Sequence, residues 1–295
     1  MAIRRLDHRA SWTAQVCAAQ RAAETMQSPG RRLLDDPYAH HFVAHPALRG
    51  ALLHRLTARA FIGVLNRNSP GVHDFVALRV RYIDELIRTA TQHGIEQIAL
   101  LGAGFDTTSL RIAASPVTVF EIDTPATQKD KRLVAEPLLP GASRAKVVWV
   151  PCDFEHDSLS DRLLGSGFDP SQPSVITWIG VTMFLTPQAI AATFADLSAL
   201  CAPGSQLAFD YIDANVVTGD SRSRGARRVA RTVARRGEPY RTGFAAPEVE
   251  ALVADYGFTC REHARTSALL RRYAPEQAHT ATDNDWLAVA TAQRI

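Results

Sequence analysis

The sequence predicts an α/β fold built on a mostly parallel sheet, and three observations support this prediction. From about residue 95 onward, short apolar runs alternate with helical segments, which is typical of a buried parallel sheet with helical crossovers. A glycine turn directly follows the first apolar run, as it does in open sheets that bind nucleotides. Residues 1–93 show helical periodicity and no convincing strand, which indicates a helical N-terminal cap.

The length and composition fit one large folded domain. A chain of 295 residues can bury a sizeable core. Its 46% hydrophobic and 21% charged residues are close to the average for globular proteins, which argues against disorder and against a fibrous architecture. We expect residues 94–295 to form the α/β core, with the helical cap of residues 1–93 integral to the same domain.

The elements follow from periodicity and from stop signals. The clearest helix of the cap is expected over residues 75–93, because apolar residues recur there at helical spacing and Gly94 is a natural stop. Further helices are expected to begin near Asp106, Pro125, Asp157 and Pro187, and one is expected over residues 246–256. Seven strands, making a sheet with helices on both faces, are expected at 95–101, 117–122, 146–150, 174–179, 205–211, 258–263 and 286–290.

The glycine turn is the first candidate binding element. Gly102, Ala103 and Gly104 follow the first predicted strand, but a tight strand-to-helix turn alone would also favour these glycines. The next strand supplies the context, because it ends in Glu121 and Asp123, and Asp123 lies 21 positions after Gly102. That spacing suits a carboxylate on the ribose hydroxyls of a bound cofactor.

The residues after the glycines indicate which cofactor binds. A dinucleotide site favours a third glycine and an uncluttered helix N-terminus for the pyrophosphate, but here those positions are Thr107 and Asp106. The Asp106 carboxylate would repel a pyrophosphate and would tolerate the ammonium and sulfonium groups of S-adenosyl-L-methionine. Asp153, at the end of the third strand, can accept a hydrogen bond from an adenine amino group, although capping of a surface turn would explain it equally well.

At this point the chain resembles the leucine carboxyl methyltransferase-like (PPM/LCMT) family of class I S-adenosylmethionine-dependent O-methyltransferases. The resemblance spans roughly residues 11–290 and is specific as a combination of motifs. It implies a Rossmann-like sheet of the class I type. The motifs are Arg31-Arg32-Leu33-Leu34-Asp35-Asp36-Pro37-Tyr38-Ala39, Leu78-Arg79-Val80-Arg81-Tyr82-Ile83-Asp84, Leu101-Gly102-Ala103-Gly104-Phe105-Asp106-Thr107-Thr108, Glu121-Ile122-Asp123-Thr124-Pro125, Trp178-Ile179-Gly180-Val181-Thr182-Met183-Phe184-Leu185 and Ala202-Pro203-Gly204-Ser205.

The resemblance also implies roles for individual residues. It places Gly102 and Gly104 against the methionine part of the cofactor and Asp123 on its ribose. It further implies that Asp153 and Phe154 lie beside the adenine, and that Arg79 pairs with the methionine carboxylate. The chain departs from the family pattern after the fourth strand: Ile179 precedes Gly180 where many members have glutamate, and Phe184 stands where tyrosine is common.

The acceptor side is less well defined by the sequence. A carboxylate acceptor needs only orientation, whereas a hydroxyl acceptor benefits from a general base, and the sequence leaves both open. The candidates are His73, before the Arg79 segment, and Tyr211, at the end of the fifth strand. For His73 a helix cap or a surface position is favoured over a role as a base, and Tyr211 is better suited to lining the pocket than to moving a proton.

Five arginines in the interruption at 213–243 are spaced for one helical face: Arg224, Arg227, Arg228, Arg231 and Arg235. A solvated lid helix explains them, and a lid that attracts a small anionic acceptor is the alternative. Nucleic acid is not expected as a partner of the arginine-rich segment 221–241, because no aromatic residue lies among these five arginines.

Other classes of protein and partner are less well supported. No metal is expected, because the short group of His40, His41 and His45 lies in the helical cap and the four cysteines are widely spread. No apolar stretch approaches the roughly 20 residues of a membrane helix, so we expect a cytoplasmic monomer or homodimer without a membrane partner. An NAD(P)-dependent oxidoreductase and a catalytically silent protein that binds S-adenosyl-L-methionine remain as alternatives to an O-methyltransferase of specialised metabolism.

Overall fold

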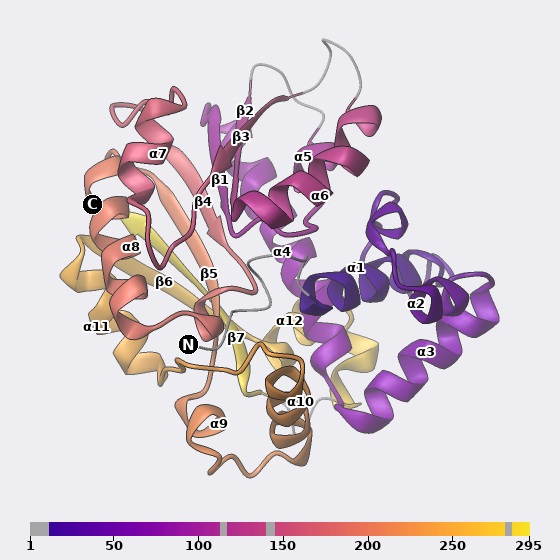
Figure 1. Ribbon diagram of the computed structural model, residues 1–295. Coiled ribbons are helices and arrows are strands. Elements are labelled where there is room, and N and C mark those ends of the chain that lie inside the picture. Colours follow the sequence, from indigo (N-terminus) through magenta and orange to yellow (C-terminus); the bar gives the residue numbers. More distant parts are fainter. Residues whose placement is uncertain (1–11, 113–116, 140–144, 281–284) are drawn as a thin grey trace.

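A seven-stranded sheet forms the centre of the molecule (Figure 1). The computed structural model describes residues 12–112, 117–139, 145–280 and 285–295. The strand order is β3-β2-β1-β4-β5-β7-β6; β1 to β5 are parallel, and β7 runs antiparallel to both β5 and β6. The prediction of a mostly parallel α/β sheet is therefore confirmed. The strands are β1 Gln97–Leu101, β2 Thr118–Asp123, β3 Lys146–Pro151, β4 Ser174–Trp178, β5 Gln206–Ile212, β6 Phe258–Arg265 and β7 Leu287–Arg294.

Helices cover both faces of the sheet and bury two separate cores. One face packs against α4 (Val72–Gln92) and α12 (Thr266–Tyr273), whose apolar side chains meet those of β1, β4 and β5. The other face packs against α7 (Leu159–Gly165), α8 (Pro187–Leu200) and α11 (Ala246–Asp255). Successive side chains of a strand point to opposite faces of the sheet, so each strand contributes residues to both cores in alternation.

Three helices precede α4 and pack around a third, smaller core. They are α1 (Trp12–Thr25), α2 (Pro46–Ala51) and α3 (Arg55–Asn68), with the short 3-10 helix η2 (Ala39–Phe42) between the first two. Phe42 of η2 stacks near Phe105, with ring centroids 5.7 Å apart, so this core reaches the residue that follows the glycine turn.

Local signals explain several helix boundaries. The side chain of Thr186 accepts a hydrogen bond from the amide of Ala189, and Pro187 occupies the first turn of α8. Ser223 caps α10 (Arg224–Arg235) in the same way, so the arginine-rich segment is helical as its spacing predicts. It follows α9 (Ala214–Thr218).

Two expectations about the elements need correction. The helix expected to begin near Asp106 is only the single turn α5 (Thr108–Arg111): Asp106 Oδ1 accepts hydrogen bonds from the amide and the hydroxyl of Thr108 before the helix begins, and Ile112 ends it with an extended backbone. Helix α12 was not predicted from the sequence. The remaining elements are α6 (Pro125–Ala135), η3 (Glu136–Leu138), η4 (Thr182–Phe184) and η5 (Pro275–Thr280).

Among the residues that the structure describes, no helix combines the length and the apolar composition that crossing a bilayer requires.

Candidate functional site

The strand register brings the predicted cofactor residues to one edge of the sheet. Leu101, the last residue of β1, pairs with Ile122 of β2 on one side and with Trp178 of β4 on the other. The residues that follow these strands therefore lie next to one another. The strand order also reverses between β1 and β4, and an open α/β sheet binds its ligands at the carboxyl ends of strands beside such a reversal.

The turn after β1 requires glycine at two positions. Gly102 and Gly104 have φ values of 62° and 45°, in the left-handed region that side chains with a Cβ rarely adopt. A Cβ on Gly102 would also lie 2.3 Å from Cγ2 of Val181, in the loop after β4. The turn after β1 and the loop after β4 are therefore in direct contact.

Asp123 fixes the glycine turn and retains capacity for a ligand. Its Oδ2 accepts a hydrogen bond of 2.5 Å from the amide of Gly104, and its Oδ1 accepts one of 2.7 Å from the amide of Thr124. A carboxylate offers about four lone-pair positions, so both oxygens can still accept ribose hydroxyls. Burial raises the pKa of Asp123 above its usual value, against the lowering effect of these two amides.

Glu121 lies on the same face of β2 as Asp123, but its carboxylate is enclosed by side-chain contacts. Its side chain is 1% exposed and forms an ion pair with Lys131 of α6, while Ser109 of α5 donates a hydrogen bond of 2.5 Å to its Oε1. The structure thus places Glu121 inside the packing between β2, α5 and α6. Its carboxylate holds α5 and α6 against β2. This position gives no support to the sequence-based expectation that Glu121 contacts the cofactor.

Thr107 belongs to a buried polar network that joins the cap to the glycine turn. Its hydroxyl donates to Oδ2 of Asp36, which also receives a hydrogen bond of 2.8 Å from Arg21 of α1. Arg111 lies 3.4 Å from the same carboxylate oxygen and pairs with Asp84 of α4 at 2.6 Å. We name these five residues the Asp36 network. Although burial alone would raise the pKa of Asp36, Arg21 and Arg111 hold it below its usual value.

Asp106 lies between this network and the glycine turn. Burial would raise the pKa of its carboxyl group, but Arg111, Lys131 and Arg21 together lower it. Asp106 is therefore a carboxylate at neutral pH, beside the position expected for a cationic ligand.

The turn after β3 holds the two residues expected beside the adenine. Asp153 accepts a hydrogen bond of 3.0 Å from the amide of Glu155 with Oδ1, which shapes the turn. Phe154 is buried, with its ring centroid 5.8 Å from that of Trp178. Because Asp123 of β2 pairs with Pro151 of β3, this turn lies next to Asp123.

Arg79 of α4 reaches the same edge from the other side of β1. Its Nη1 donates a hydrogen bond of 2.5 Å to Asp210 of β5, and Asp210 in turn accepts one of 2.6 Å from the amide of Gly180. The Nε of Arg79 is buried and has no hydrogen-bond partner among the described residues. An unpaired buried donor is costly, so this atom fits a carboxylate ligand. Ile179, which precedes Gly180, is half-buried and apolar, so its side chain can supply contact but no polar bond.

The two acceptor-side candidates do not meet at this edge. His73 is 1% exposed, and its Nε2 lies 2.8 Å from Oε2 of Glu24, which links α4 to α1. Tyr211 points to the opposite face of β5 from Asp210, and its hydroxyl lies 3.0 Å from Nδ1 of His263. These positions give both residues structural contacts and leave their predicted role at the acceptor without support.

Residues 236–242 cross the edge near Arg79, and we call them the strap. On one side Arg236 lies over the ring of Trp12, 4.3 Å from its centroid, and Glu238 accepts hydrogen bonds from Thr13. On the other side the amide of Arg241 donates a hydrogen bond of 2.7 Å to the carbonyl oxygen of Met183. The strap is therefore fastened to α1 and to the loop after β4.

Tyr240 of the strap is a site residue that the sequence analysis missed. Its ring centroid lies 5.4 Å from that of Phe184. Burial raises the pKa of its hydroxyl, and Cys17, Asp210 and Arg79 are close enough to act on it electrostatically. No sequence motif includes position 240. Its neighbour in space, Phe184, belongs to the motif that follows β4.

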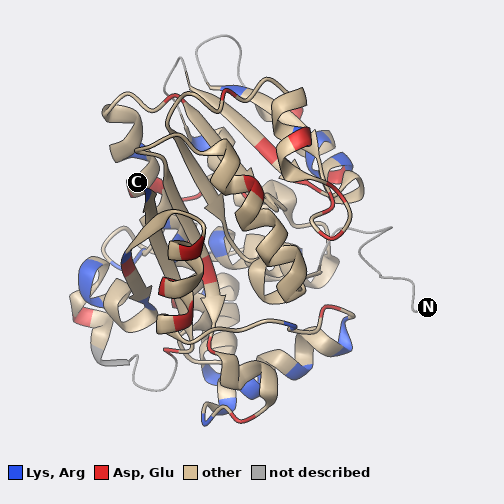
Figure 2. Ribbon diagram, turned by 90° about the vertical axis from the view of Figure 1, so that its left-hand side faces the viewer, with Lys and Arg blue, Asp and Glu red and all other residues tan. Residues whose placement is uncertain are grey.

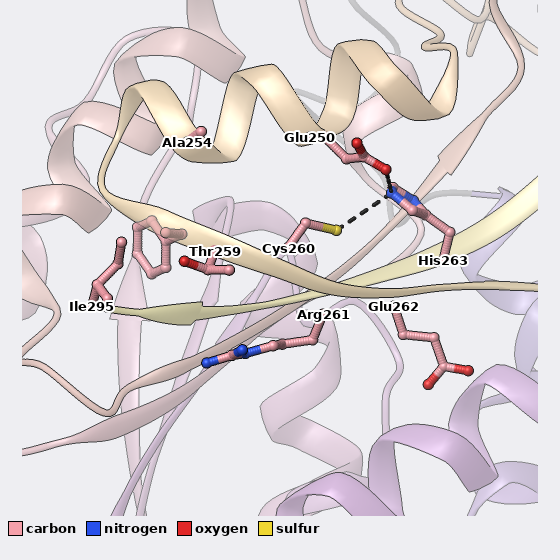
Figure 3. A pocket seen from close by; sticks show the side chains of 9 residues that line it. Glu250, Ala254, Thr259, Cys260, Arg261, Glu262, His263 and Ile295 are labelled. Atoms are coloured by element: carbon pink, nitrogen blue, oxygen red, sulfur yellow. Dashed lines mark hydrogen bonds and ion pairs between the residues drawn. The ribbon is translucent and has the colours of Figure 1, made fainter.

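A surface hollow of about 580 Å³ lies elsewhere, between α11 and β6 at the far edge of the sheet (Figure 3). Figure 3 shows His263 between Cys260 and Glu250, at 3.3 Å from the sulfur and 3.4 Å from the carboxylate. Strands β4, β5 and β7 separate this hollow from the glycine turn, so it is not part of the candidate site. Within the described part of the chain, no group of three His, Cys, Asp or Glu side chains could hold a metal ion.

Comparison with solved structures gives the same fold. A DUF574 family protein from Streptomyces avermitilis aligns over 99% of this chain and 100% of its own, with a TM-score of 0.60 and 16% identity. A "putative methyltransferase" from Thermobifida fusca aligns over 93% of this chain and 94% of its own, with a TM-score of 0.59 and 15% identity. At such low identity these likenesses concern the fold alone.

Comparison with known protein sequences gives the family. A protein of Mycobacterium tuberculosis named "Putative S-adenosyl-L-methionine-dependent methyltransferase" is 34% identical over 67% of this chain and 62% of its own length. One of the same name from Bacillus subtilis is 30% identical over 63% of this chain and 61% of its length, so the chain spans about three fifths of these relatives. The model of the leucine carboxyl methyltransferase family matches residues 14–198, which include the cap, the glycine turn, Asp123 and Arg79. The chain therefore belongs to the leucine carboxyl methyltransferase family.

Proposed function

We propose that this protein binds S-adenosyl-L-methionine and transfers its methyl group to an oxygen of a small acceptor. The observation that carries the proposal is the convergence of Asp123 with Arg79 at one sheet edge. Asp123 has lone pairs to accept ribose hydroxyls, and Arg79 has an unpaired buried donor for a carboxylate. The family of the chain supports the same cofactor.

The described residues suit the different parts of this cofactor. In the proposed arrangement, Nε of Arg79 binds the methionine carboxylate and the glycine turn admits the methionine backbone. Asp106, which is held ionised, favours the positive charges of the ammonium and sulfonium groups. Asp153 accepts from the adenine amino group, while Phe154 supplies an apolar contact beside it.

The chemistry asks little of the protein beyond alignment and exclusion of water. When bound, S-adenosyl-L-methionine would supply an electrophilic methyl group on its sulfonium, open to direct displacement by the acceptor oxygen with the thioether as leaving group. The strap covers the sheet edge beside Asp210. The raised pKa of Tyr240 keeps its hydroxyl protonated, so in our proposal this hydroxyl donates a hydrogen bond to the acceptor. Neither His73 nor Tyr211 is placed to act as a base, and therefore a carboxylate acceptor is favoured over a hydroxyl.

The arginines of α10 support an anionic acceptor. Arg224, Arg228, Arg231 and Arg235 are exposed, so they would act by raising the local concentration of anions near the strap and would not bind the acceptor directly. In our proposal the protein is a cytoplasmic monomer or homodimer, and its acceptor is a small anion.

Calorimetric titration with S-adenosyl-L-methionine, S-adenosylhomocysteine and NAD tests the cofactor. We expect the wild type to bind both sulfur ligands and not NAD. Asp123→Ala should bind them roughly 100-fold more weakly, because two hydrogen bonds to a charged group are lost. Asp161→Ala, which removes an exposed carboxylate from α7, should bind like the wild type.

The other outcomes separate the alternatives. Binding of NAD alone would identify an oxidoreductase and refute the proposal. Binding of the sulfur ligands without methyl transfer to any member of a panel of carboxylic acids and phenols would identify a catalytically silent protein. Equal affinity of Asp123→Ala and wild type would remove the proposed ribose contact.

A further inference from the structure

Positive charge is concentrated in two short segments of the chain. Residues 46–73 and 221–237 contain eleven arginines and no aspartate or glutamate. Because the formal net charge of the whole chain is only +3, all other residues together carry −8. Such a strong separation favours an oriented approach to an anionic surface.

The first segment includes α3, which exposes large apolar side chains. Leu56 is 80% exposed, Val64 is 58% exposed, and Leu53 just before the helix is 70% exposed. The helical spacing of 56, 60 and 64 places Leu56 and Val64 on the same outward side of α3, while Arg59 and Arg67 flank them and are exposed. Only Ala58 of this helix is fully buried.

The second segment forms α10, and its exposed arginines share one face. Arg224, Arg228, Arg231 and Arg235 recur at intervals of three and four residues, opposite the buried Ala226 and Val233. Figure 2 shows the blue segments of α10 along the lower edge of the molecule. None of these four arginines pairs with an acidic residue in the described part of the chain.

A direct contact joins the two segments. Nη1 of Arg228 donates a hydrogen bond of 2.5 Å to Oδ1 of Asn68, the last residue of α3. The C-terminal end of α3 thus lies against α10, and we call the exposed sides of these two helices the α3–α10 face. It combines projecting aliphatic side chains with a row of arginines that have no acidic partner among the described residues.

We propose that the α3–α10 face docks on the anionic surface of a lipid bilayer. Arginines there would bind lipid phosphates, while Leu53, Leu56 and Val64 would enter the boundary between headgroups and acyl chains. This is attachment to the surface and needs no membrane-spanning helix. It revises the sequence-based expectation of no membrane partner.

The composition of the face favours lipid over other anionic partners. A protein interface is anchored by large aromatic side chains in complementary pockets, but the two segments contain no Trp or Tyr and their only Phe, Phe61, is half-buried. The phosphates of a nucleic acid would bind the arginines but would gain nothing from contact with isolated leucines. A bilayer accepts isolated aliphatic side chains without shape complementarity, so it matches both features.

Co-sedimentation with lipid vesicles tests the proposal without reference to catalysis. We expect the full chain to bind vesicles of 30% phosphatidylserine and 70% phosphatidylcholine on the order of 100-fold more tightly than pure phosphatidylcholine, with most binding lost at 0.5 M salt. Arg231→Gln/Arg235→Gln should weaken binding at least about tenfold. Leu56→Ser should weaken it roughly fivefold.

Matched variants separate the face from bulk charge and general exposure. Arg162→Gln/Arg261→Gln removes the same number of exposed charges from α7 and β6, and Leu133→Ser changes a leucine of α6 that is 71% exposed. Both should bind like the wild type. Equal affinity for the two kinds of vesicle, or equal losses in the face variants and these controls, would overturn the proposal.

Discussion

The two halves of the candidate site are built in different ways. Around β1 and β2, the glycine turn and Asp123 are fixed by short hydrogen bonds and by the Asp36 network. Asp36 itself is only 1% exposed. Around β4 and β5, the strap lies over the edge and is held by separate contacts to α1 and to the loop after β4, such as that from Thr13 to Glu238. The cofactor half is therefore expected to be rigid, and the acceptor half to be adjustable.

This difference matches the demands on each half. S-adenosyl-L-methionine has one shape, so a family can preserve one set of buried contacts for it. Acceptors differ in shape, and residues in loosely fastened segments can change without disturbing the sheet. The predictions below test whether the cofactor half loses stability and the acceptor half loses only acceptor binding.

The largest effect is expected for Asp36→Ala. The substitution leaves the buried guanidinium groups of Arg21 and Arg111 without their shared carboxylate, which should lower the free energy of unfolding by about 3–5 kcal/mol. Urea denaturation measures this loss. Asp35→Ala is the matched control, because Asp35 is largely exposed and pairs only with Arg32, so its loss should change stability by at most about 0.5 kcal/mol.

The same carboxylate gives a pH dependence. Because the pKa of Asp36 is lower in the folded protein than its usual value of 3.8, its contribution to stability is present above that pH and is lost as the pH falls through the folded pKa. The stability difference between wild type and Asp36→Ala should therefore shrink below pH 4. A difference that stays constant down to pH 2.5 would contradict the ion-pair explanation.

An intermediate effect is expected for Gly102→Ala. The new Cβ adopts an unfavourable φ and meets Val181, which together should lower the free energy of unfolding by about 2–5 kcal/mol. Gly104→Ala should lose only about 1–2 kcal/mol, because its Cβ would meet nothing closer than Ala14 at 3.7 Å. Thermal unfolding compares the two.

Val181→Ala supplies the check on the steric part. Combined with Gly102→Ala, it should lose less stability than the sum of the single substitutions, since the two side chains no longer collide. Strict additivity would show that the loops after β1 and β4 are not in the contact described.

The smallest effect is expected in the acceptor half, for Tyr240→Phe. Loss of one hydrogen bond to the acceptor should lower kcat/KM for the methyl acceptor about tenfold, while the dissociation constant of S-adenosyl-L-methionine stays unchanged. Tyr273→Phe removes a hydroxyl bonded to Glu85 at the surface and should alter neither. A loss of cofactor affinity in Tyr240→Phe would place this residue in the cofactor half instead.

The sequence predicted the cofactor half better than the acceptor half. The seven strands, α4 and the positions of the glycines and Asp123 follow from periodicity and from spacing, which are local signals. Glu121 shows the limit of such signals, because strand alternation puts it on the same face as Asp123, and only tertiary packing reveals Lys131 beside it. The single turn of α5 is a second example, because the extended backbone of Ile112 ends the helix and no sequence signal marks that position.

The acceptor half could not be predicted in the same way. Tyr240 lies 56 positions after Phe184 in the chain, and no periodicity connects the two, although their rings are neighbours. No sequence signal marks Asp210 as the partner of Arg79, because the face on which each strand residue lies depends on where α4 packs. His73 was selected for its chemistry, but its burial against Glu24 depends on α1.

The Asp36 network also bears on how genes of this kind are recognised. A shortened chain that begins at residue 94 would retain both glycines and Asp123, the features by which a motif search finds the family. It would nevertheless lack the carboxylates that Thr107 and Arg111 contact, because Asp36 and Asp84 precede that point. Possession of the glycine motif is therefore no measure of an intact protein, because a start site placed too late would yield a polypeptide in which Thr107 and Arg111 lack these buried partners.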